Sequence, residues 1–248
     1  MYGVLIQCRG PRMKIETASS LVALLLPPLL LTSQPADGFS YSANPIHATV
    51  VDSASGKPIS NVIVVTRWQL EDVNGHFSGN FHVDETVTNV KGDFSIPAWG
   101  PTAVPSDPHN PFHTLRMGPM EPDIILFKPG YKLGVEHGPW ESAYLSDPSW
   151  KGEAIRTSFW DSRNIKLAIF SGSDELYNRI LELNVSLLPW GSCAWTRMPR
   201  MTAALVVEGN RLKYLRGYNS VLRLDELEET EDGKLCGSAS KILAPYLK

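Results

Sequence analysis

Residues 88–100 read TNVKGDFSIPAWG, and this stretch predicts one hairpin of a β-sandwich. Asn89 begins a tight turn, and Gly92 ends it in the left-handed backbone region that short hairpin loops require. Phe94 and Ile96 then alternate with polar residues, as they would on the inward face of a strand. The proline that follows has no N–H to donate, so it ends the strand.

Further strands are expected on both sides of this hairpin. The run NVIVVTRWQL at residues 61–70 is nearly continuous in β-branched residues, which is typical of a strand buried on both faces. In FHVDETVT at residues 81–88, Phe81, Val83 and Val87 are expected to share one face. Residues 98–121 are rich in proline, glycine and histidine and predict a long loop. Other strands are expected at residues 46–52 and 123–127, with one or two more in residues 154–170.

The hydrophobic period changes after residue 170, and helices are expected from there on. Ser173 is the expected N-cap of a first helix that ends before Pro189. Pro199 is placed to open a second helix, which Gly209 is expected to end. Further helices are expected at residues 220–229 and close to the C-terminus. The predicted fold class is mainly β: an antiparallel β-sandwich at residues 44–170, followed by a small α-helical region at 171–248, α+β overall.

Three segments resemble the carboxypeptidase regulatory-like domain family. They are GKPISNVIVV at residues 56–65, TNVKGDFSIP at 88–97 and FKPGYK at 127–132, in that order. The resemblance implies a transthyretin-like antiparallel β-sandwich. It covers residues 46–131 and has no counterpart for the helical region. The family has no catalytic residues, so the resemblance implies an accessory or binding module rather than an enzyme.

Residues 1–40 are predicted to be a signal peptide or an uncleaved N-terminal anchor. Arg9, Arg12 and Lys14 precede an apolar run at residues 21–31, which is short for a membrane span and is interrupted by prolines. We expect this segment to engage the membrane during export, with cleavage after Gly38 or Ser40. The protein is then periplasmic or secreted, or membrane-tethered where the segment is retained.

Cysteine usage agrees with export. Cys8 lies in the segment that is expected to be removed, which leaves Cys193 and Cys236. An even number of cysteines is typical of exported proteins, and a Cys193–Cys236 disulfide is the predicted pairing. The alternative is two separate buried thiols.

The charge and the known sequence motifs exclude several functions. The formal net charge is −3 and the pI is about 6.1, which argues against a nucleic-acid partner. The chain has no P-loop, no dinucleotide-binding fingerprint and no G-x-S-x-G turn. The sequence therefore predicts no cofactor and no enzymatic activity.

Two groups of side chains are candidate binding residues. All six histidines lie between His47 and His137, and a metal site for zinc or copper is one interpretation of this clustering. The aromatic residues near the predicted loops suit stacking on sugars or contact with a partner protein, or else they pack the loops onto the sandwich. The candidate metal ligands are His82, Asp84, His109 and His113, and the candidate binding aromatics are Trp99, Trp140, Tyr144 and Trp150.

The sequence thus predicts a non-catalytic, exported β-sandwich module with a structural or a ligand- or protein-binding role. One alternative is a metal-binding exported protein that uses the histidine cluster. Another is a carbohydrate-binding accessory domain. The expected partner is a protein or a glycan, and the sequence does not indicate an oligomeric state.

Overall fold

The structure is a computed structural model, and it describes residues 40–72, 74–106, 115–118, 122–139, 153–185, 188, 193–212, 227 and 236–247. By its contacts the chain divides after Pro35, and everything described below belongs to the unit formed by residues 36–248. Almost all of the predicted signal segment lies outside the described residues. In the described part of the chain, no helix is long and apolar enough to cross a membrane.

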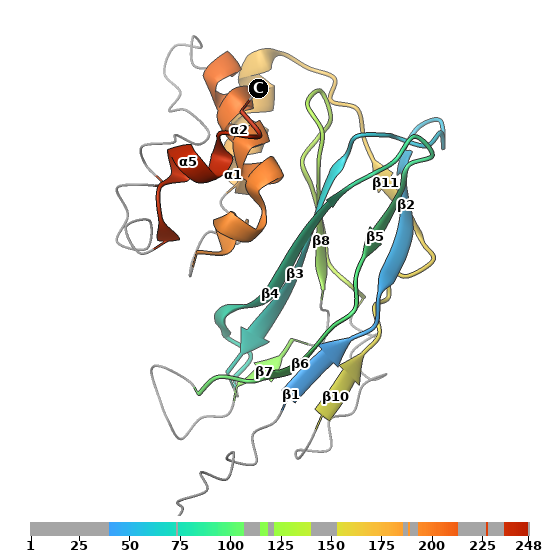
Figure 1. Cartoon of the computed structure of the whole chain (residues 1–248). Helices are drawn as coiled ribbons and strands as arrows, with labels where there is room; N and C mark the ends of the chain where they lie inside the picture. Colours follow the sequence, from blue (N-terminus) through green and yellow to red (C-terminus); the bar gives the residue numbers. More distant parts are fainter. Residues whose placement is uncertain are drawn as a thin grey trace, which may run out of the picture. The chain divides into compact units, whose positions relative to one another are not determined.

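Strands dominate the first half of this unit, as the sequence predicts (Figure 1). The first five are β1 (Ser40–Ala43), β2 (Ile46–Asp52), β3 (Ile63–Glu71), β4 (Phe77–Val87) and β5 (Asp93–Ile96). The others are β6 (Trp99–Ala103), β7 (Arg116–Met117), β8 (Asp123–Phe127), β9 (Gly134–Glu136), β10 (Glu153–Arg156) and β11 (Asn164–Leu167). Strands β6 and β7 fall where the sequence predicted one long loop, so that part of the prediction is wrong.

The strands form three sheets. The largest has the order β4-β3-β8-β9, with β7 also paired to β3, and is called the central sheet. The second has the order β11-β2-β5 and is called the opposing sheet, and the third has the order β10-β1-β6. Most neighbours are antiparallel, but β1 pairs with β10 and β2 pairs with β11 in parallel. The mainly β, sandwich-like fold class is confirmed.

The predicted turn is present between β4 and β5, but the two strands do not pair as a hairpin, because β4 belongs to the central sheet and β5 pairs with β2 in the opposing sheet. Gly92 adopts a φ of 77°, and a Cβ placed on it would lie 2.6 Å from the carbonyl oxygen of Val50. Glycine is required there both for the backbone angle and for this close approach. The Asn89 side chain accepts hydrogen bonds from the backbone N–H groups of Lys91 and Asp93, which closes the turn. Phe94 and Ile96 are buried.

A β-bulge changes the direction in which the side chains of β4 point. Trp68 pairs with His82 and Gln69 pairs with Asn80, so Phe81 has no partner opposite it on β3. As a result Phe81 packs toward the interior of the sandwich, whereas Val83 packs toward the helices. The expectation that these two residues share a face is therefore wrong.

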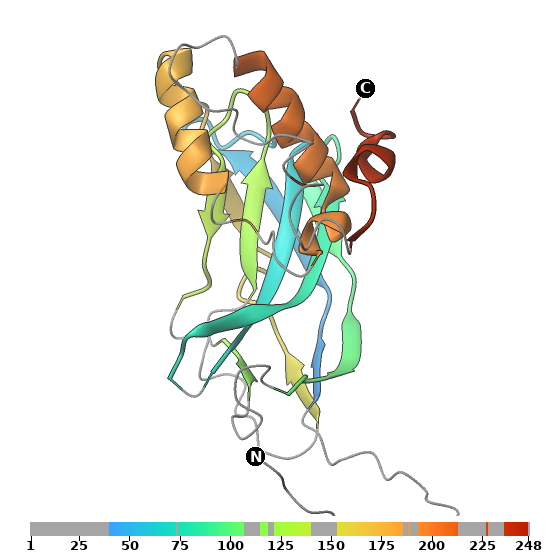
Figure 2. The same cartoon turned by 90° about the vertical axis from the view of Figure 1, so that its left-hand side faces the viewer.

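The helices cover one face of the central sheet (Figure 2). They are α1 (Asp174–Val185), the 3₁₀ helix η2 (Ala194–Arg197), α2 (Pro199–Leu212) and α5 (Ala239–Leu243). Ser173 caps α1 and Pro199 opens α2, as predicted. Gly209 is buried inside α2 and does not end it, which corrects the predicted boundary. The predicted helix at residues 220–229 lies almost entirely outside the described residues.

A buried carboxylate attaches the helices to the sheet. Glu85 of β4 accepts hydrogen bonds from the backbone N–H groups of Arg200 (2.9 Å) and Met201 (2.7 Å) at the start of α2. These are N–H groups that a helix leaves without an internal partner. Burial raises the pKa of Glu85, and the two backbone hydrogen bonds oppose that rise.

The predicted disulfide is present in the same layer. Cys193 at the start of η2 is bonded to Cys236, just before α5, and their Cα atoms are 5.3 Å apart. The bond closes a loop with a sequence separation of 43 residues. In the chain-entropy model such a closure contributes about 4 kcal/mol to stability.

The helical layer should weaken in alkaline solution because of Tyr177 of α1. Burial, with Glu208 of α2 nearby, raises the pKa of Tyr177 to about 12. Above pH 10 the unfolded chain then loses this proton before the folded chain does, so the free energy of unfolding falls as the pH rises. Tyr177→Phe should remove this part of the fall in urea unfolding measured at pH 9 and pH 11. Tyr246→Phe is the exposed control; equal pH slopes for Tyr177→Phe and the unsubstituted protein would refute the assignment.

Candidate functional site

A group of polar side chains lies on the outer face of the central sheet. It consists of Arg67 and Gln69 of β3, Asp123 of β8 and His137, which directly follows β9; we call it the polar ledge. Val65 and Ile125, two positions further along the same strands and on the same face, pack against the helices. The polar ledge therefore begins where the apolar contact between the sheet and the helices ends.

Strand register brings these residues together although they are far apart in the sequence. Arg67 lies opposite Asp123 in the antiparallel pairing of β3 and β8. Glu136 lies opposite Ile124 in the pairing of β8 and β9, so the next residue, His137, is at the level of Asp123. Side chains at one level on adjacent strands, and on one face, are in contact distance.

Asp123 is the centre of the polar ledge. Its side chain is only 4% exposed, and Arg67 beside it is 11% exposed. Both Nε and Nη2 of Arg67 donate to Oδ2 of Asp123, with the Nε contact at 3.1 Å. The Nε2 atom of Gln69 donates to the same oxygen at 3.0 Å. A buried carboxylate needs such donors, because burial without them costs several kcal/mol.

His137 is attached to the other oxygen of this carboxylate. Its Nδ1 atom lies 2.6 Å from Oδ1 of Asp123, and its side chain is 55% exposed. One edge of the imidazole is thus held by a buried acid, while much of the ring remains accessible to solvent. This is the arrangement in which a carboxylate orients a histidine so that the second ring nitrogen can exchange a proton with a bound molecule.

The predicted metal ligands are only partly within the described residues. His82 and Asp84 are joined by a 2.7 Å contact between Nε2 and Oδ2. His109 and His113 lie outside the described part of the chain. Among the residues that the structure describes, no group of three or more histidine, cysteine, aspartate or glutamate side chains is placed to hold a metal ion.

The predicted aromatic binding residues are also only partly within the described residues. Trp140, Tyr144 and Trp150 lie outside the described residues. Trp99 of β6 is half-buried, and its ring stacks on His82 with centroids 4.5 Å apart. It also makes an edge contact with buried Trp68. The structure thus places Trp99 in an aromatic cluster at the side of the sandwich.

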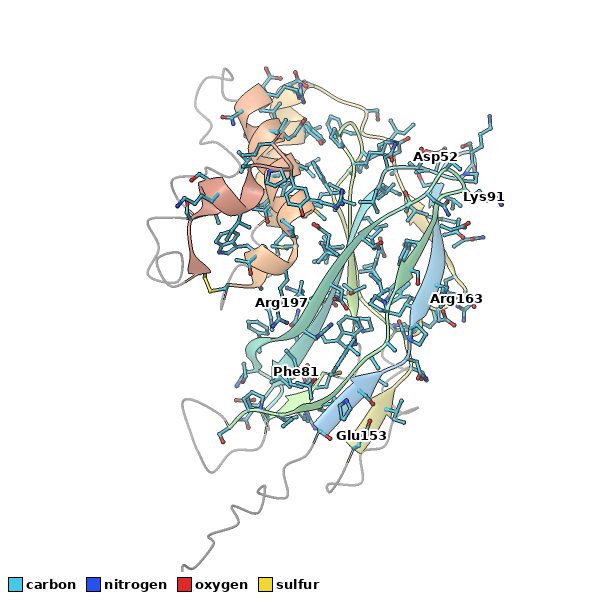
Figure 3. The ribbon with its side chains drawn as sticks, in the orientation of Figure 1. Asp52, Phe81, Lys91, Glu153, Arg163 and Arg197 are labelled. Atoms are coloured by element: carbon cyan, nitrogen blue, oxygen red, sulfur yellow. A yellow bond between two sulfur atoms is a disulfide. The ribbon has the colours of Figure 1, made fainter. Side chains whose placement is uncertain are left out.

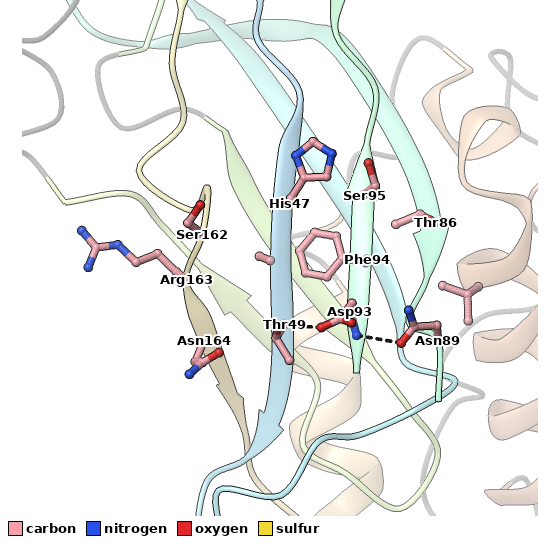
Figure 4. Close-up of a pocket in the computed structure, with 12 residues that line it drawn as sticks. His47, Thr49, Thr86, Asn89, Asp93, Phe94, Ser95, Ser162, Arg163 and Asn164 are labelled. Atoms are coloured by element: carbon pink, nitrogen blue, oxygen red, sulfur yellow. Dashed lines mark hydrogen bonds between the residues drawn. The ribbon is translucent and has the colours of Figure 1, made fainter. Parts of the chain in front are cut away.

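A second candidate region is a hollow of about 570 Å³ on the opposing sheet (Figure 4). Figure 3 shows Arg163 and Lys91 on this side of the sandwich, away from the helices. Thr49 donates to Asp93 at 2.8 Å, and His47 Nδ1 is 3.8 Å from Asp161, too far for a hydrogen bond. His47 is thus not oriented as His137 is, and the hollow offers polar contacts without a positioned proton-transfer group.

The polar ledge is not predicted from the sequence, in which His137 is only the last member of the histidine cluster and Asp123 only the start of a strand. A signal was present: Arg67 interrupts the apolar run at residues 61–70, and Asp123 opens the apolar strand at 123–127. Charged residues in strands that are buried on both faces must be paired, which favours contact between these two.

No protein-family model matches the chain, and no curated protein matches it. Among solved structures, the chain is similar to 3-chlorocatechol 1,2-dioxygenase from Rhodococcus opacus 1CP, with 18% identity and a TM-score of 0.25; the match covers 56% of this chain and 62% of that one. It is also similar to a point mutant of catechol 1,2-dioxygenase from Acinetobacter radioresistens, with 15% identity, a TM-score of 0.28, and coverage of 54% and 57%.

A third similar structure is the dioxygenase domain of a dioxygenase–carbohydrate-binding protein fusion from Streptomyces sp. SirexAA-E. The identity is 16%, the TM-score is 0.22, and the match covers 58% of this chain and 96% of that one. The match spans less than two thirds of the length of each of the first two proteins.

These comparisons contradict the expectation of a non-catalytic module, because all three similar structures are dioxygenases or a dioxygenase domain. That expectation is withdrawn. It rested on the family resemblance and on the absence of linear motifs, and a site assembled from several strands has no such motif. The metal-binding and carbohydrate-binding alternatives stay predictions, because most of their residues lie outside the described part of the chain. TM-scores below 0.3 assign no reaction to this chain, so its chemistry is argued below from its own residues.

Loss of the Arg67 guanidinium should destabilise the fold strongly. Arg67→Ala leaves Asp123 buried without its charged partner, and breaking a buried ion pair in this way costs about 3–5 kcal/mol. The double variant Arg67→Met/Asp123→Leu removes both charges and should lose less stability than the single variant. Urea unfolding of the three proteins measures both differences. A loss below about 1 kcal/mol in Arg67→Ala would contradict the buried pairing.

Proposed function

We propose that this chain is an exported enzyme in which His137, oriented by Asp123, takes a proton from a bound substrate or from water during the reaction. One observation carries the proposal: Nδ1 of the accessible His137 lies 2.6 Å from an oxygen of the buried Asp123. A histidine held in this way has one nitrogen fixed by the protein and the other free for general acid–base catalysis, which typically contributes about 10²- to 10⁴-fold in rate.

The surroundings of the His137–Asp123 pair support a catalytic role over a purely structural one. Arg67 and Gln69 donate from within the sheet to Oδ2 of the carboxylate, so they carry the charged partner and leave Oδ1 turned toward His137. His137 adds a further partner from the strand edge and is left 55% exposed. A buried acid behind an accessible imidazole is also how proteins place a base within reach of a substrate.

The reaction that tests this is the hydrolysis of 4-nitrophenyl acetate. In it, water adds to the acyl carbon, 4-nitrophenolate leaves, and a base near the water receives its proton. We expect His137→Gln to lower the hydrolysis rate about 10²-fold, the loss typical of a missing general base. Release of 4-nitrophenolate, followed by its absorbance in the visible range, measures the rate.

His76 provides a matched control. It also contacts an aspartate, with Nδ1 3.2 Å from Oδ2 of Asp72, but its side chain is 78% exposed and lies on a hairpin turn. His76→Gln should therefore leave the rate unchanged. The proposal fails if both variants hydrolyse the ester equally fast, or if the unsubstituted protein is no faster than imidazole at the same concentration.

The exported location is part of the proposal. The Cys193–Cys236 disulfide supports it, because structural disulfides persist in oxidising compartments. The basic and then apolar segment at residues 1–40 supports it as well. Within the sandwich, the three segments at residues 56–65, 88–97 and 127–132 support a relationship to the carboxypeptidase regulatory-like domains.

Expression of the full chain in a host with a secretion pathway tests the location. We expect a mature protein in the exported fraction that begins near residue 39 or 41, or a full-length protein in the membrane fraction where the segment is retained. Cys193 and Cys236 should resist iodoacetamide until a reductant is added. A full-length cytoplasmic product with both thiols alkylated directly would contradict export.

A further inference from the structure

Two donors on the Arg67 side chain meet a single oxygen of Asp123. The Nε and Nη2 atoms of Arg67 both donate to Oδ2. The fork of a guanidinium matches the two oxygens of a carboxylate, and the parallel two-bond arrangement is the favoured one. Other contacts of Asp123 oppose a turn of its carboxylate into that arrangement, and the contact with His137 is one of them.

Gln69 supplies a second one. Its Nε2 atom donates to Oδ2 at 3.0 Å, from the next outward-facing position on β3. Oδ2 therefore receives three N–H groups from β3, and the carboxylate is turned so that Oδ1 faces His137 at 2.6 Å. Loss of the Gln69 donor removes one of the three N–H groups that hold Oδ2 at β3, which favours rotation of the carboxylate toward the two-oxygen arrangement with Arg67 and draws Oδ1 away from His137.

We infer that Gln69 is the positioning residue that fixes the tautomer of His137. An ionised carboxylate only accepts hydrogen bonds, so the nitrogen that faces Oδ1 must carry the hydrogen. The neutral imidazole then has its hydrogen on Nδ1 and its lone pair on Nε2. Arg67 compensates the negative charge of Asp123, whereas Gln69 determines which oxygen of the carboxylate faces His137.

The fixed tautomer also defines the substrate class, and this step rests on the proposed function. A lone pair on Nε2 accepts a hydrogen bond and then a proton. The site therefore takes a substrate that presents a hydroxyl group, or a water molecule bound beside it. A group that can only accept hydrogen bonds, such as an ether or a ketone oxygen, is not recognised by this nitrogen.

Nitrogen-15 NMR of protein labelled in its histidines tests the inference without any substrate. At about pH 8.5, well above the ordinary histidine pKa, the unsubstituted protein should show His137 as a single tautomer with a protonated Nδ1, and His137→Gln assigns the signals. In Gln69→Leu, which keeps the side-chain size but removes the donor, His137 should show averaged shifts from two tautomers. Gln69→Lys restores a donor to Oδ2 and should restore the single tautomer.

Ester hydrolysis in the same variants separates this inference from the proposed function. We expect Gln69→Leu to lower kcat about 10-fold with little change in KM, and Gln69→Lys to recover most of it. If the tautomer of His137 changes but no hydrolysis depends on His137, the positioning role of Gln69 stands and the proposed enzymatic function is contradicted. An unchanged tautomer in a folded Gln69→Leu protein, with hydrolysis still dependent on His137, would overturn the positioning role and leave the enzyme.

Discussion

The arrangement of this unit depends on burial of the central sheet on both faces. Its inner face packs into the sandwich through residues such as Val64 and Trp68, and its outer face packs against the helices through Val65 and Ile125. A strand in this position can carry a charge only where an opposite charge lies beside it. Arg67 and Asp123 meet this condition at one level of the β3–β8 pairing. The ion pair and the apolar pattern thus specify the same register.

The helices and the polar ledge share the outer face between them. Glu85 holds the start of α2 on β4, and the disulfide ties η2 to the segment before α5, so the helical layer is fixed to one half of the sheet. Beyond that layer the same strands carry polar side chains instead of apolar ones. Because these side chains belong to neighbouring strands rather than to loops, the distances among them are set by the sheet, which is the condition for a well-positioned catalytic group.

Much of this fold could be predicted from the sequence, and the candidate site could not. The turn with Gly92, the buried valine run, the capped helix α1 and the Cys193–Cys236 pairing each depend on residues close in sequence or on a simple count. The predicted pairing of β4 with β5 as a hairpin is wrong, because the two strands enter different sheets. The bulge at Phe81 could not be predicted, because it depends on how β4 pairs with β3. Arg67 and Asp123 interrupt apolar strands and so indicate a charge pair, but their contact with His137 depends on the register of β8 and β9, for which no local pattern exists. The sequence drew attention to the histidines, but burial decides which of them matters.

Burial of the aspartate separates His137 from three other histidines that lie near an aspartate. Asp84 beside His82 is 26% exposed, whereas Asp123 is 4% exposed. His76 contacts Asp72 on an exposed turn, and His47 lies near Asp161 with both side chains largely exposed. In these two cases water competes for the partners, so the contact neither fixes the ring nor adds much stability. Asp123 is almost fully buried and is saturated by donors from β3, so it cannot move to follow the histidine. The ring of His137 must instead adopt the orientation that the carboxylate allows, and its outer nitrogen is thereby directed toward any molecule that binds beside the sheet.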